Sequence, residues 1–332
     1  MAATRLCSSS APSQPRASPG RENPVTTEHS YQTQAAPRYV LVTPARNEAA
    51  QIGQTLESVS RQTLPPLKWI IVDDASTDGT GEIARRYAAR FPWIEVAQMP
   101  PRQGRDFAAK VRAFDAGLER VRALDYEVIG NLDADVSLAP GDLAALVSRF
   151  AADPKLGVAG PAFSEGGRQL YDYRYTSAAG VWGGCQLFRR DCFEQIGGYV
   201  PIAGGGIDYA AVLKARAAGW KTRTFEEVRV IHHRRMGTAE SRRLQARYRM
   251  GKKDYALGCH PLWEAFRVAY QMTKPPLALG GLAIGAGYLA SALRRAPRPI
   301  SRELVAFRRR EEMARLRAKL GLAPRPAGTG RS

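Results

Sequence analysis

The chain has 332 residues, which suits one large domain or two modest ones, and its 44% apolar content excludes a wholly disordered chain and a polytopic membrane protein. Its 49 Lys and Arg residues outnumber its 31 Asp and Glu residues, giving a formal net charge of +18 at pH 7. Residues 1–220 carry a net charge of only +1, whereas residues 221–332 carry +17. The charge therefore points to an anionic partner for the last third alone.

Residues 1–36 are rich in Ser, Pro, Ala, Gln and Thr and contain no apolar run, so we expect a disordered leader there. The four cysteines show no close-paired metal spacing, which favours free thiols in a reducing compartment.

From Tyr39 onward, short apolar runs alternate with segments of helical period, a pattern that predicts an α/β sheet with helices on its faces. The predicted strands are 39–43, 69–73, 94–98, 127–132, 157–162, 186–188 and 222–225. The helical stripes between them lie within 52–59, 107–121 and 143–150. Because open α/β sheets bind ligands at the carboxyl ends of their strands, the residues just after each strand are the candidates for function.

Polar side chains follow the first two predicted strands, namely Asn47, Glu48, Asp73, Asp74 and Asp78. Asn47 and Asp78 are also good N-cap residue types, so helix capping is an alternative interpretation of these two. Helix capping can use only one of two adjacent acids at a strand end. It therefore does not explain the Asp73–Asp74 pair, for which a binding role is favoured.

The strand predicted at 127–132 ends in Asp133-Ala134-Asp135. Two carboxylates at this spacing, just past a buried strand, can turn toward one divalent ion and a nucleotide. Hard oxygen ligands that leave room for phosphate oxygens suit Mg²⁺ or Mn²⁺. An isolated Asp-x-Asp is common in loops, but this one follows an apolar strand and two other polar strand ends.

Taken in order, these motifs resemble the family 2 glycosyltransferases of the GT-A fold, in their membrane-associated bacterial form. The resemblance extends from Tyr39 to about Arg235 and rests on Pro44-x-x-Asn47-Glu48, on Val72-Asp73-Asp74-x-Ser76-x-Asp78, on residues 104–117 with Lys110, and on Asp133-x-Asp135. It implies a GT-A catalytic domain over residues 37–235, with a mixed sheet and flanking helices. It also implies that the nucleotide-sugar is bound by Pro44, Asn47, Glu48, Asp74, Lys110 and Asp133.

The same resemblance implies that Asp133 and Asp135 hold a Mg²⁺ or Mn²⁺ ion on the diphosphate, with Asp135 the more direct ligand. His232 and His233 follow a late apolar run, where several GT-A enzymes place a histidine that completes the metal site. Either histidine could take this role; phosphate contact and ordinary packing are the alternatives.

Further along the chain, Trp182, Gly183 and Gly184 are similar to the acceptor side of these enzymes, and so is the glycine run that ends at Gly206. Family members place their catalytic base next, usually within a paired acid motif, and here only Asp208 is acidic. Asp208 would then remove the proton from the acceptor hydroxyl in a single, inverting displacement. A role as the N-cap of the helix that begins near Tyr209 is the alternative.

Within the basic third, residues 277–293 form an uncharged run whose length is marginal for a membrane span. The run holds four glycines, which disfavour a helix in water, although a buried soluble helix is an alternative. Both flanks are strongly basic, which places both on the cytosolic side. We therefore expect a re-entrant or interfacial insertion, with 262–272 and 304–320 lying on an anionic membrane surface.

These features divide the chain into the leader 1–36, the catalytic domain 37–235, a basic membrane-associated helical segment 236–295 and a basic amphipathic tail 296–332. They predict an inverting, metal-dependent glycosyltransferase at the cytoplasmic face of the cell membrane, with no nucleic-acid partner. The expected donor is a UDP-sugar on family frequency, with GDP-mannose next, and the expected acceptor is a lipid-linked or cell-surface polysaccharide precursor.

Two other functions are compatible with parts of the pattern. A sugar nucleotidyltransferase shares the fold type, but such enzymes usually carry a glycine-rich basic phosphate loop after the first strand, and residues 43–48 are not one. A basic module that binds membranes or nucleic acids fits the charge, but it leaves the acidic clusters at the strand ends unexplained.

Overall fold

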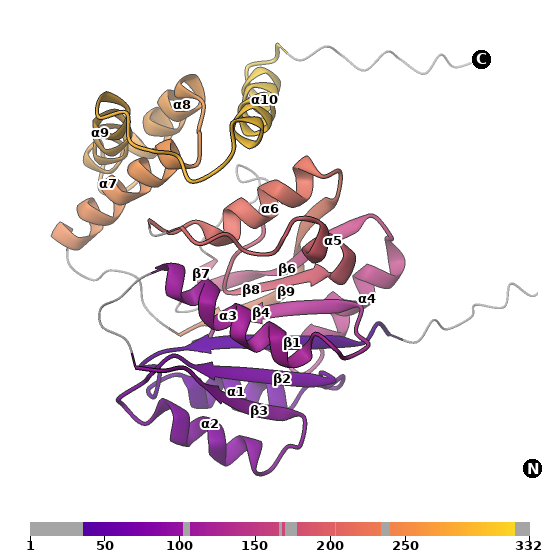
Figure 1. Ribbon diagram of the computed structural model, residues 1–332. Helices are drawn as coiled ribbons and strands as arrows, with labels where there is room; N and C mark the ends of the chain where they lie inside the picture. Colours follow the sequence, from indigo (N-terminus) through magenta and orange to yellow (C-terminus); the bar gives the residue numbers. More distant parts are fainter. Residues whose placement is uncertain are drawn as a thin grey trace, which may run out of the picture. The chain divides into compact units, whose positions relative to one another are not determined.

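The computed structural model describes residues 36–101, 107–165, 168–169, 178–202, 204–233 and 240–322. The expected leader at 1–36 lies outside the described residues except for its last residue, and so does the end of the tail beyond 322. Within the described part, nine strands form one sheet (Figure 1). They are β1 (Tyr39–Ala45), β2 (Lys68–Asp73), β3 (Ile94–Gln98), β4 (Val128–Leu132), β5 (Val136–Ser137), β6 (Leu156–Glu165), β7 (Arg168–Gln169), β8 (Cys185–Arg189) and β9 (Lys221–His232).

The sheet is mixed, as the sequence predicted. The strand order is β3-β2-β1-β4-β8-β6-β9-β5, and β7 pairs with β6. Strands β1, β2, β3 and β4 run parallel, whereas β8 is antiparallel to both β4 and β6. All seven predicted strands are present, and the last continues through a second apolar run into one long strand, β9. The two-residue strands β5 and β7 are too short for an apolar period and were not predicted.

Helices cover both faces of the sheet, because successive strand residues point to opposite sides. Tyr39 and Leu41 of β1 pack in one core with α1 (Ile52–Ser60), α2 (Thr80–Ala88) and α4 (Asp142–Ala152). Val40 and Val42 pack in the other core with α3 (Phe107–Val121), α5 (Arg190–Gln195) and α6 (Ile207–Ala217). The three helical stripes predicted from the sequence lie in α1, α3 and α4 and face these cores.

Four further helices follow the sheet: α7 (Glu240–Ala256), α8 (Pro261–Met272), α9 (Leu279–Leu293) and α10 (Arg302–Lys319) (Figure 1). Helix α9 comprises most of the uncharged run and packs closely on α7. A Cβ atom added to Gly251 would lie 1.9 Å from the carbonyl oxygen of Ile284, and one added to Gly287 would lie 2.0 Å from that of Tyr248. The glycines that disfavour this helix in water thus allow two backbones to meet. No described helix is both long and apolar enough to cross a membrane.

Helix α10 is attached to α6 by ionic and aromatic contacts. The guanidinium of Arg216 donates to both carboxylate oxygens of Glu311, each at 3.0 Å. The guanidinium carbon of Arg308 lies 4.8 Å from the centre of the Tyr209 ring, and this arginine also donates to Glu312 at 2.7 Å. The C-terminal helices are therefore fixed to the helix that carries Asp208.

A buried carboxyl in this region gives the first prediction. Glu264 on α8 is only 3% exposed, and its nearest recorded cation, Arg267, lies 4.0 Å away. Burial raises the pKa of Glu264 to about 7, with a further increase from Asp254, although Arg267 opposes both. The folded protein therefore holds this proton more tightly than the unfolded chain, and the stabilisation is lost as the pH rises through about 7.

Urea unfolding near pH 5.5 and pH 8 checks this expectation. We expect the wild-type protein to lose on the order of 1–3 kcal/mol of unfolding free energy between these pH values through Glu264. Glu264→Gln should remove that part of the pH dependence and be the more stable protein at the higher pH. An identical pH dependence in both proteins would contradict the assignment.

Candidate active site

The topology gathers the predicted site residues at one edge of the sheet. Strands β1, β2 and β4 are parallel, so their carboxyl ends lie together. Strand β8 runs the other way, and Cys185 at its start pairs with Leu132 at the end of β4. The glycines before β8 therefore lie beside the Asp133-Ala134-Asp135 segment, and the amide of Asp133 donates to the carbonyl oxygen of Gly184 at 2.8 Å.

Asn47 joins the loop after β1 to the loop after β2. Its side-chain oxygen accepts from the amide of Thr77 at 2.9 Å, and its own amide donates to Ser76 at 3.1 Å. Asn47 has a φ of 54°, a left-handed conformation that asparagine adopts more readily than most residues. The N-cap of α1 is Gln51, so the alternative in which Asn47 caps that helix is wrong.

The same two loops are joined by backbone amides and short acceptors. The amide of Glu48 donates to the Thr80 hydroxyl at 2.8 Å, and the amide of Ala49 donates to Asp78 at 3.0 Å. Asp78 also accepts from the amide of Thr80, the first residue of α2, but the N-cap of that helix is Gly79. Half-buried Pro44 lies in β1 opposite Val72, directly before these loops.

The two acids after β2 are placed differently. Asp73 accepts from the amide of Ser76 at 2.9 Å, and a Cβ atom added to Gly81 would lie 2.4 Å from Asp73 Oδ2. Asp73 therefore shapes the turn into α2. Asp74 is 6% exposed and lies 3.8 Å from the guanidinium of Arg46. Asp74 thus contacts the loop that follows β1.

Lys110 from α3 lies among the acidic residues of the site. Its ammonium donates to Asp133 Oδ1 at 2.5 Å, and Asn131 donates to the same oxygen at 3.2 Å. Burial alone lowers the pKa of Lys110, but the charges of Asp133, Asp208 and Asp135 outweigh it and hold that pKa above the ordinary value. A protonated lysine thus lies near three carboxylates and in direct contact with Asp133.

Asp135 and His232 face each other at the end of β9. His232 Nε2 lies 3.4 Å from Asp135 Oδ2, and Asp135 is 7% exposed. His233 points elsewhere: its Nε2 lies 2.9 Å from the Ser137 hydroxyl, and burial lowers its pKa below the ordinary value. The structure therefore separates two histidines that the sequence left equivalent.

The site offers few protein ligands for a divalent cation. The described residues contain no group of three or more His, Cys, Asp or Glu side chains that could hold a metal. One carboxylate and one imidazole are nonetheless available in Asp135 and His232. Mg²⁺ is commonly held by one or two carboxylates together with substrate phosphates, so this pair fits an ion whose remaining ligands come from the donor.

Asp208 lies in the first turn of α6 and directly above Gly183. A Cβ atom added to Gly183 would lie 2.6 Å from both Asp208 Cβ and Asp208 Oδ2. The N-cap of α6 is Gly206, with a φ of 93° and no side-chain capping bond. The alternative in which Asp208 is the N-cap is therefore wrong. Its half-buried carboxylate instead lies against the Gly183–Gly184 turn, next to the acids after β4.

Trp182 and Gly206, which the resemblance assigns to the acceptor side, are held by packing contacts. The Trp182 ring stacks on Phe163 at 4.2 Å between centroids and meets His232 edge-on at 5.4 Å. It covers Gly184, where an added Cβ atom would lie 2.2 Å from the ring. A Cβ atom on Gly206 would lie 2.8 Å from Leu257, so the end of α7 reaches the start of α6.

Two supporting residues were missed from the sequence. Buried Asn131 donates to the carbonyl oxygen of Gly183 at 2.7 Å, besides its bond to Asp133. Its strand partner Gln186, which is fully buried, donates to the carbonyl oxygen of Asp208 at 3.4 Å and accepts from Tyr199 at 2.9 Å. The available signal was an uncharged polar residue inside an otherwise apolar strand, because such a residue needs partners when buried.

The close approach of Gly183 to Asp208 gives a second prediction. Gly183→Ala must displace the Asp208 carboxylate, and a shift on the order of 1 Å can cost roughly a hundredfold in rate. We expect kcat to fall about tenfold to a hundredfold while nucleotide affinity is kept. Gly204→Ala is the matched control, because a Cβ atom there would meet nothing within 4 Å. Equal turnover in both variants would contradict this packing.

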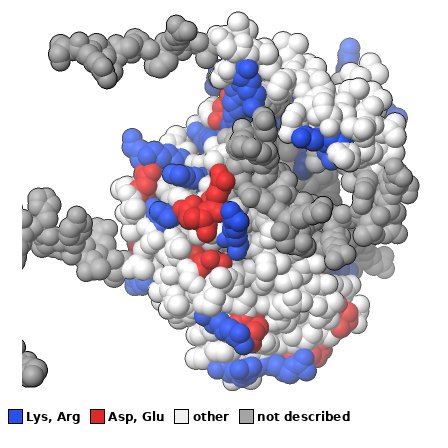
Figure 2. Space-filling model, turned by 180° about the vertical axis from the view of Figure 1, so that it is seen from behind, with Lys and Arg blue, Asp and Glu red and all other residues white. Residues whose placement is uncertain are grey.

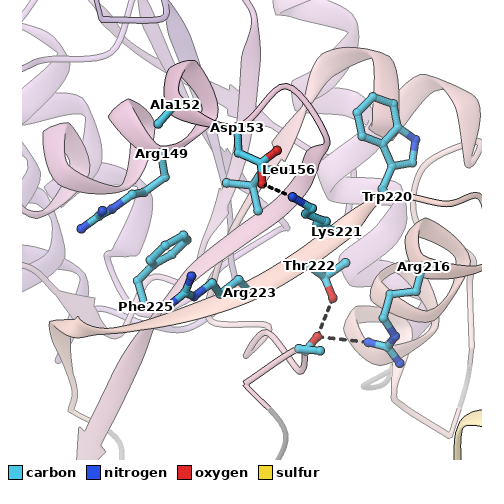
Figure 3. Close-up of a pocket in the computed structure, with 11 residues that line it drawn as sticks. Arg149, Ala152, Asp153, Leu156, Arg216, Trp220, Lys221, Thr222, Arg223 and Phe225 are labelled. Atoms are coloured by element: carbon cyan, nitrogen blue, oxygen red, sulfur yellow. Dashed lines mark hydrogen bonds and ion pairs between the residues drawn. The ribbon is translucent and has the colours of Figure 1, made fainter. Parts of the chain in front are cut away.

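A cavity lies away from this site. It measures about 510 Å³ and is lined by residues that include Arg149, Asp153, Trp220 and Lys221 (Figure 3). These side chains surround the start of β9, whereas His232 ends that strand, roughly 30 Å away at 3.3 Å per residue. None of the site residues predicted from the sequence lines it.

Comparison with known proteins finds similar sequences and a similar fold. Residues 40–176 match the model of glycosyl transferase family 2. An undecaprenyl-phosphate mannosyltransferase of Micrococcus luteus is 34% identical over 110 residues, which are 33% of this chain and 43% of that protein. A polyprenol monophosphomannose synthase of Mycolicibacterium smegmatis is 29% identical over 141 residues, or 42% of this chain and 51% of that protein. The chain thus spans about half or less of the curated relatives that it matches.

Among solved structures, the mannosyltransferase PcManGT from Pyrobaculum calidifontis, in complex with GDP-Man and Mn²⁺, superposes with a TM-score of 0.53. The match covers 86% of this chain and 81% of that one at 21% identity, so it shows a shared fold alone. Residues 40–176, which include the Asp133-Ala134-Asp135 segment, thus form a domain that matches glycosyl transferase family 2.

Proposed function

We propose that this protein is an inverting, metal-dependent mannosyltransferase that moves mannose from GDP-mannose to a polyprenyl-phosphate acceptor at the cytoplasmic face of a membrane. The observation that carries the proposal is the convergence of Asp208, Lys110, Asp133 and the Asp135–His232 pair at one edge of the sheet. The arrangement supplies a base, a fixed cation and two metal ligands within one site.

The donor assignment replaces the UDP-sugar expected from the sequence. Two curated relatives are named for mannosyl or phosphomannose transfer to polyprenyl carriers, and a structure of the same fold is a complex with GDP-Man. We therefore place the guanine nucleotide between the loops joined by Asn47, with Asp74 at the base and Lys110 on the diphosphate side.

The chain's own residues supply the remaining steps. Asp208 takes the proton from the acceptor as its oxygen attacks the anomeric carbon, which is general-base catalysis. The monoanion of a phosphate acceptor still carries one proton, and its hydrogen bond to the Asp208 carboxylate also orients the acceptor before attack. When bound, a divalent cation at Asp135 and His232 offsets the charge that develops on the departing nucleoside diphosphate.

A screen of nucleotide-sugars with Mg²⁺ or Mn²⁺, with and without polyprenyl phosphate in vesicles, tests this proposal. We expect GDP-mannose to be consumed in preference to UDP-sugars, with label appearing in the organic extract only when acceptor is present. Turnover of a UDP-sugar in preference to GDP-mannose would overturn the donor assignment. Consumption of no donor under any condition would overturn the enzymatic function.

A further inference from the structure

Helix α9 has two apolar faces, and only one of them is covered within the described residues. Gly281, Ile284 and Gly287 face α7 and α8, and all three are buried. The opposite face carries four exposed leucines at successive spacings of three, seven and four residues, which places them along one side of the helix. These are Leu279, Leu282, Leu289 and Leu293, with 53%, 54%, 60% and 85% of their surface exposed. We call these four residues the leucine stripe.

Two further exposed leucines lie on segments next to α9. Leu277, immediately before α9, is 69% exposed, and Leu262 on α8 is 58% exposed. Helices α8 and α9 are in direct contact, since a Cβ atom on Gly281 would lie 2.5 Å from both Met272 and the carbonyl oxygen of Val268. Exposed apolar groups of this size are unfavourable in water, and a contiguous set of them marks an interaction surface.

The charge around the stripe is of one sign. Between residues 244 and 300, the acidic residues are Asp254 and Glu264, which are 5% and 3% exposed and lie next to Arg267. The exposed charges of this segment are all basic, and the lobe of α7–α9 shows white and blue surface from behind (Figure 2). The exposed basic residues are Arg249, Lys252, Lys274, Arg294, Arg295 and Arg298.

These observations favour a lipid surface over a second copy of the chain. In either orientation, a symmetric pairing through the stripe would bring the basic residues at its two ends, Lys274, Arg294 and Arg295, near those of the second copy, whereas anionic headgroups would neutralise them. A helix of 15 residues is roughly 22 Å long, which is less than the ~30 Å hydrocarbon core of a bilayer. The helix is therefore suited to lying in the interface rather than crossing it.

We propose that the leucine stripe of α9, with Leu262 and Leu277, docks the protein onto the surface of an anionic bilayer. The inference deepens the proposed function and rests on it in one respect, because a polyprenyl-phosphate acceptor is found in a membrane. Docking through this face brings the C-terminal helices to the bilayer. Helix α10 follows these helices in the chain, and contacts made by Arg216 and Arg308 join it to α6, the helix that carries Asp208.

Sedimentation of the full chain with vesicles tests the proposal. We expect binding to phosphatidylcholine vesicles that contain phosphatidylglycerol, weaker binding to phosphatidylcholine alone, and partial release by salt. The double variant Leu282→Gln/Leu289→Gln should bind the anionic vesicles about tenfold more weakly or worse. The control Leu67→Gln, at a leucine 44% exposed on the catalytic domain, should bind like the wild type.

Two readouts separate this inference from the proposed enzyme activity. The double variant should still consume GDP-mannose in solution, because neither leucine belongs to the candidate active site. If the wild type binds vesicles but consumes no donor, the proposed function fails and the docking surface stands. Equal vesicle binding by wild type and double variant would overturn docking through the stripe. So would a dimer that the double substitution dissociates without any change in vesicle binding.

Discussion

Asp208→Asn is expected to lower mannosyl transfer roughly 10²–10⁴-fold, the usual contribution of a general base. The substitution keeps the size of the side chain, so the contact with Gly183 and the bond from Gln186 to the Asp208 carbonyl oxygen remain. The negative charge that attracts the acceptor proton is lost. Initial rates with GDP-mannose and a polyprenyl-phosphate acceptor measure the effect, and calorimetric titration with GDP should show nearly unchanged affinity.

Asp191→Asn provides the matched control for this experiment. Asp191 is an exposed acid in the first turn of α5, just as Asp208 is an acid in the first turn of α6. The control should transfer mannose at the wild-type rate, because it removes a charge of the same kind outside the site. Turnover close to wild type in Asp208→Asn would rule this residue out as the base.

Asp135→Asn should have the second largest effect, because it removes the charged member of the proposed metal pair. The loss of Lewis-acid stabilisation corresponds to several kcal/mol, so we expect kcat/KM to fall roughly a hundredfold or more. Electron paramagnetic resonance of Mn²⁺ in the presence of GDP measures ion binding independently of activity. The affinity for Mn²⁺ should fall in this variant.

The two histidines offer an internal comparison for the metal site. His232→Gln should weaken Mn²⁺ binding, because its ring nitrogen faces Asp135, whereas His233→Gln should change it little, because that ring faces Ser137. The opposite order, or equal effects in both variants, would show that the metal pair has been assigned to the wrong residues.

Local sequence pattern predicted the framework of the site well. Apolar strands of five to seven residues alternate with helical stripes, and this pattern marked where β1, β2 and β4 end. The residues after those ends, such as Asn47, Asp74 and Asp133, do lie together at one edge. The same grouping is expected in any parallel sheet, because parallel pairing places the carboxyl ends of neighbouring strands at one edge.

Contacts between distant segments could not be read from the sequence. Capping was a fair alternative for Asn47 and Asp208 because both residue types cap helices, and only the observed caps at Gln51 and Gly206 exclude it. The choice between His232 and His233 depends on which of the two imidazole rings points toward Asp135 at the end of β9. Strand alternation sends neighbouring side chains to opposite faces, but sequence does not fix which face is which.

The uncharged run at 277–293 shows the same limit. Its glycines suggested a membrane environment, since glycine disfavours an isolated helix in water. In the fold they allow α9 to meet α7 at backbone distance, with Gly251 of α7 as the reciprocal glycine. That partner lies 36 residues from Gly287, so no local period could reveal it. The exposed leucines on the other side of the helix became evident only once its packed face was known.

The anomeric configuration of the first-formed product tests the central claim most directly, namely that Asp208 promotes a single displacement at the sugar carbon. The wild-type protein would be incubated with GDP-mannose, Mn²⁺ and a polyprenyl phosphate, and the one-bond carbon–proton coupling at the anomeric carbon of the product would be measured by NMR. The account predicts a product whose anomeric configuration is opposite to that of the donor. A product that retains the donor's configuration would contradict it.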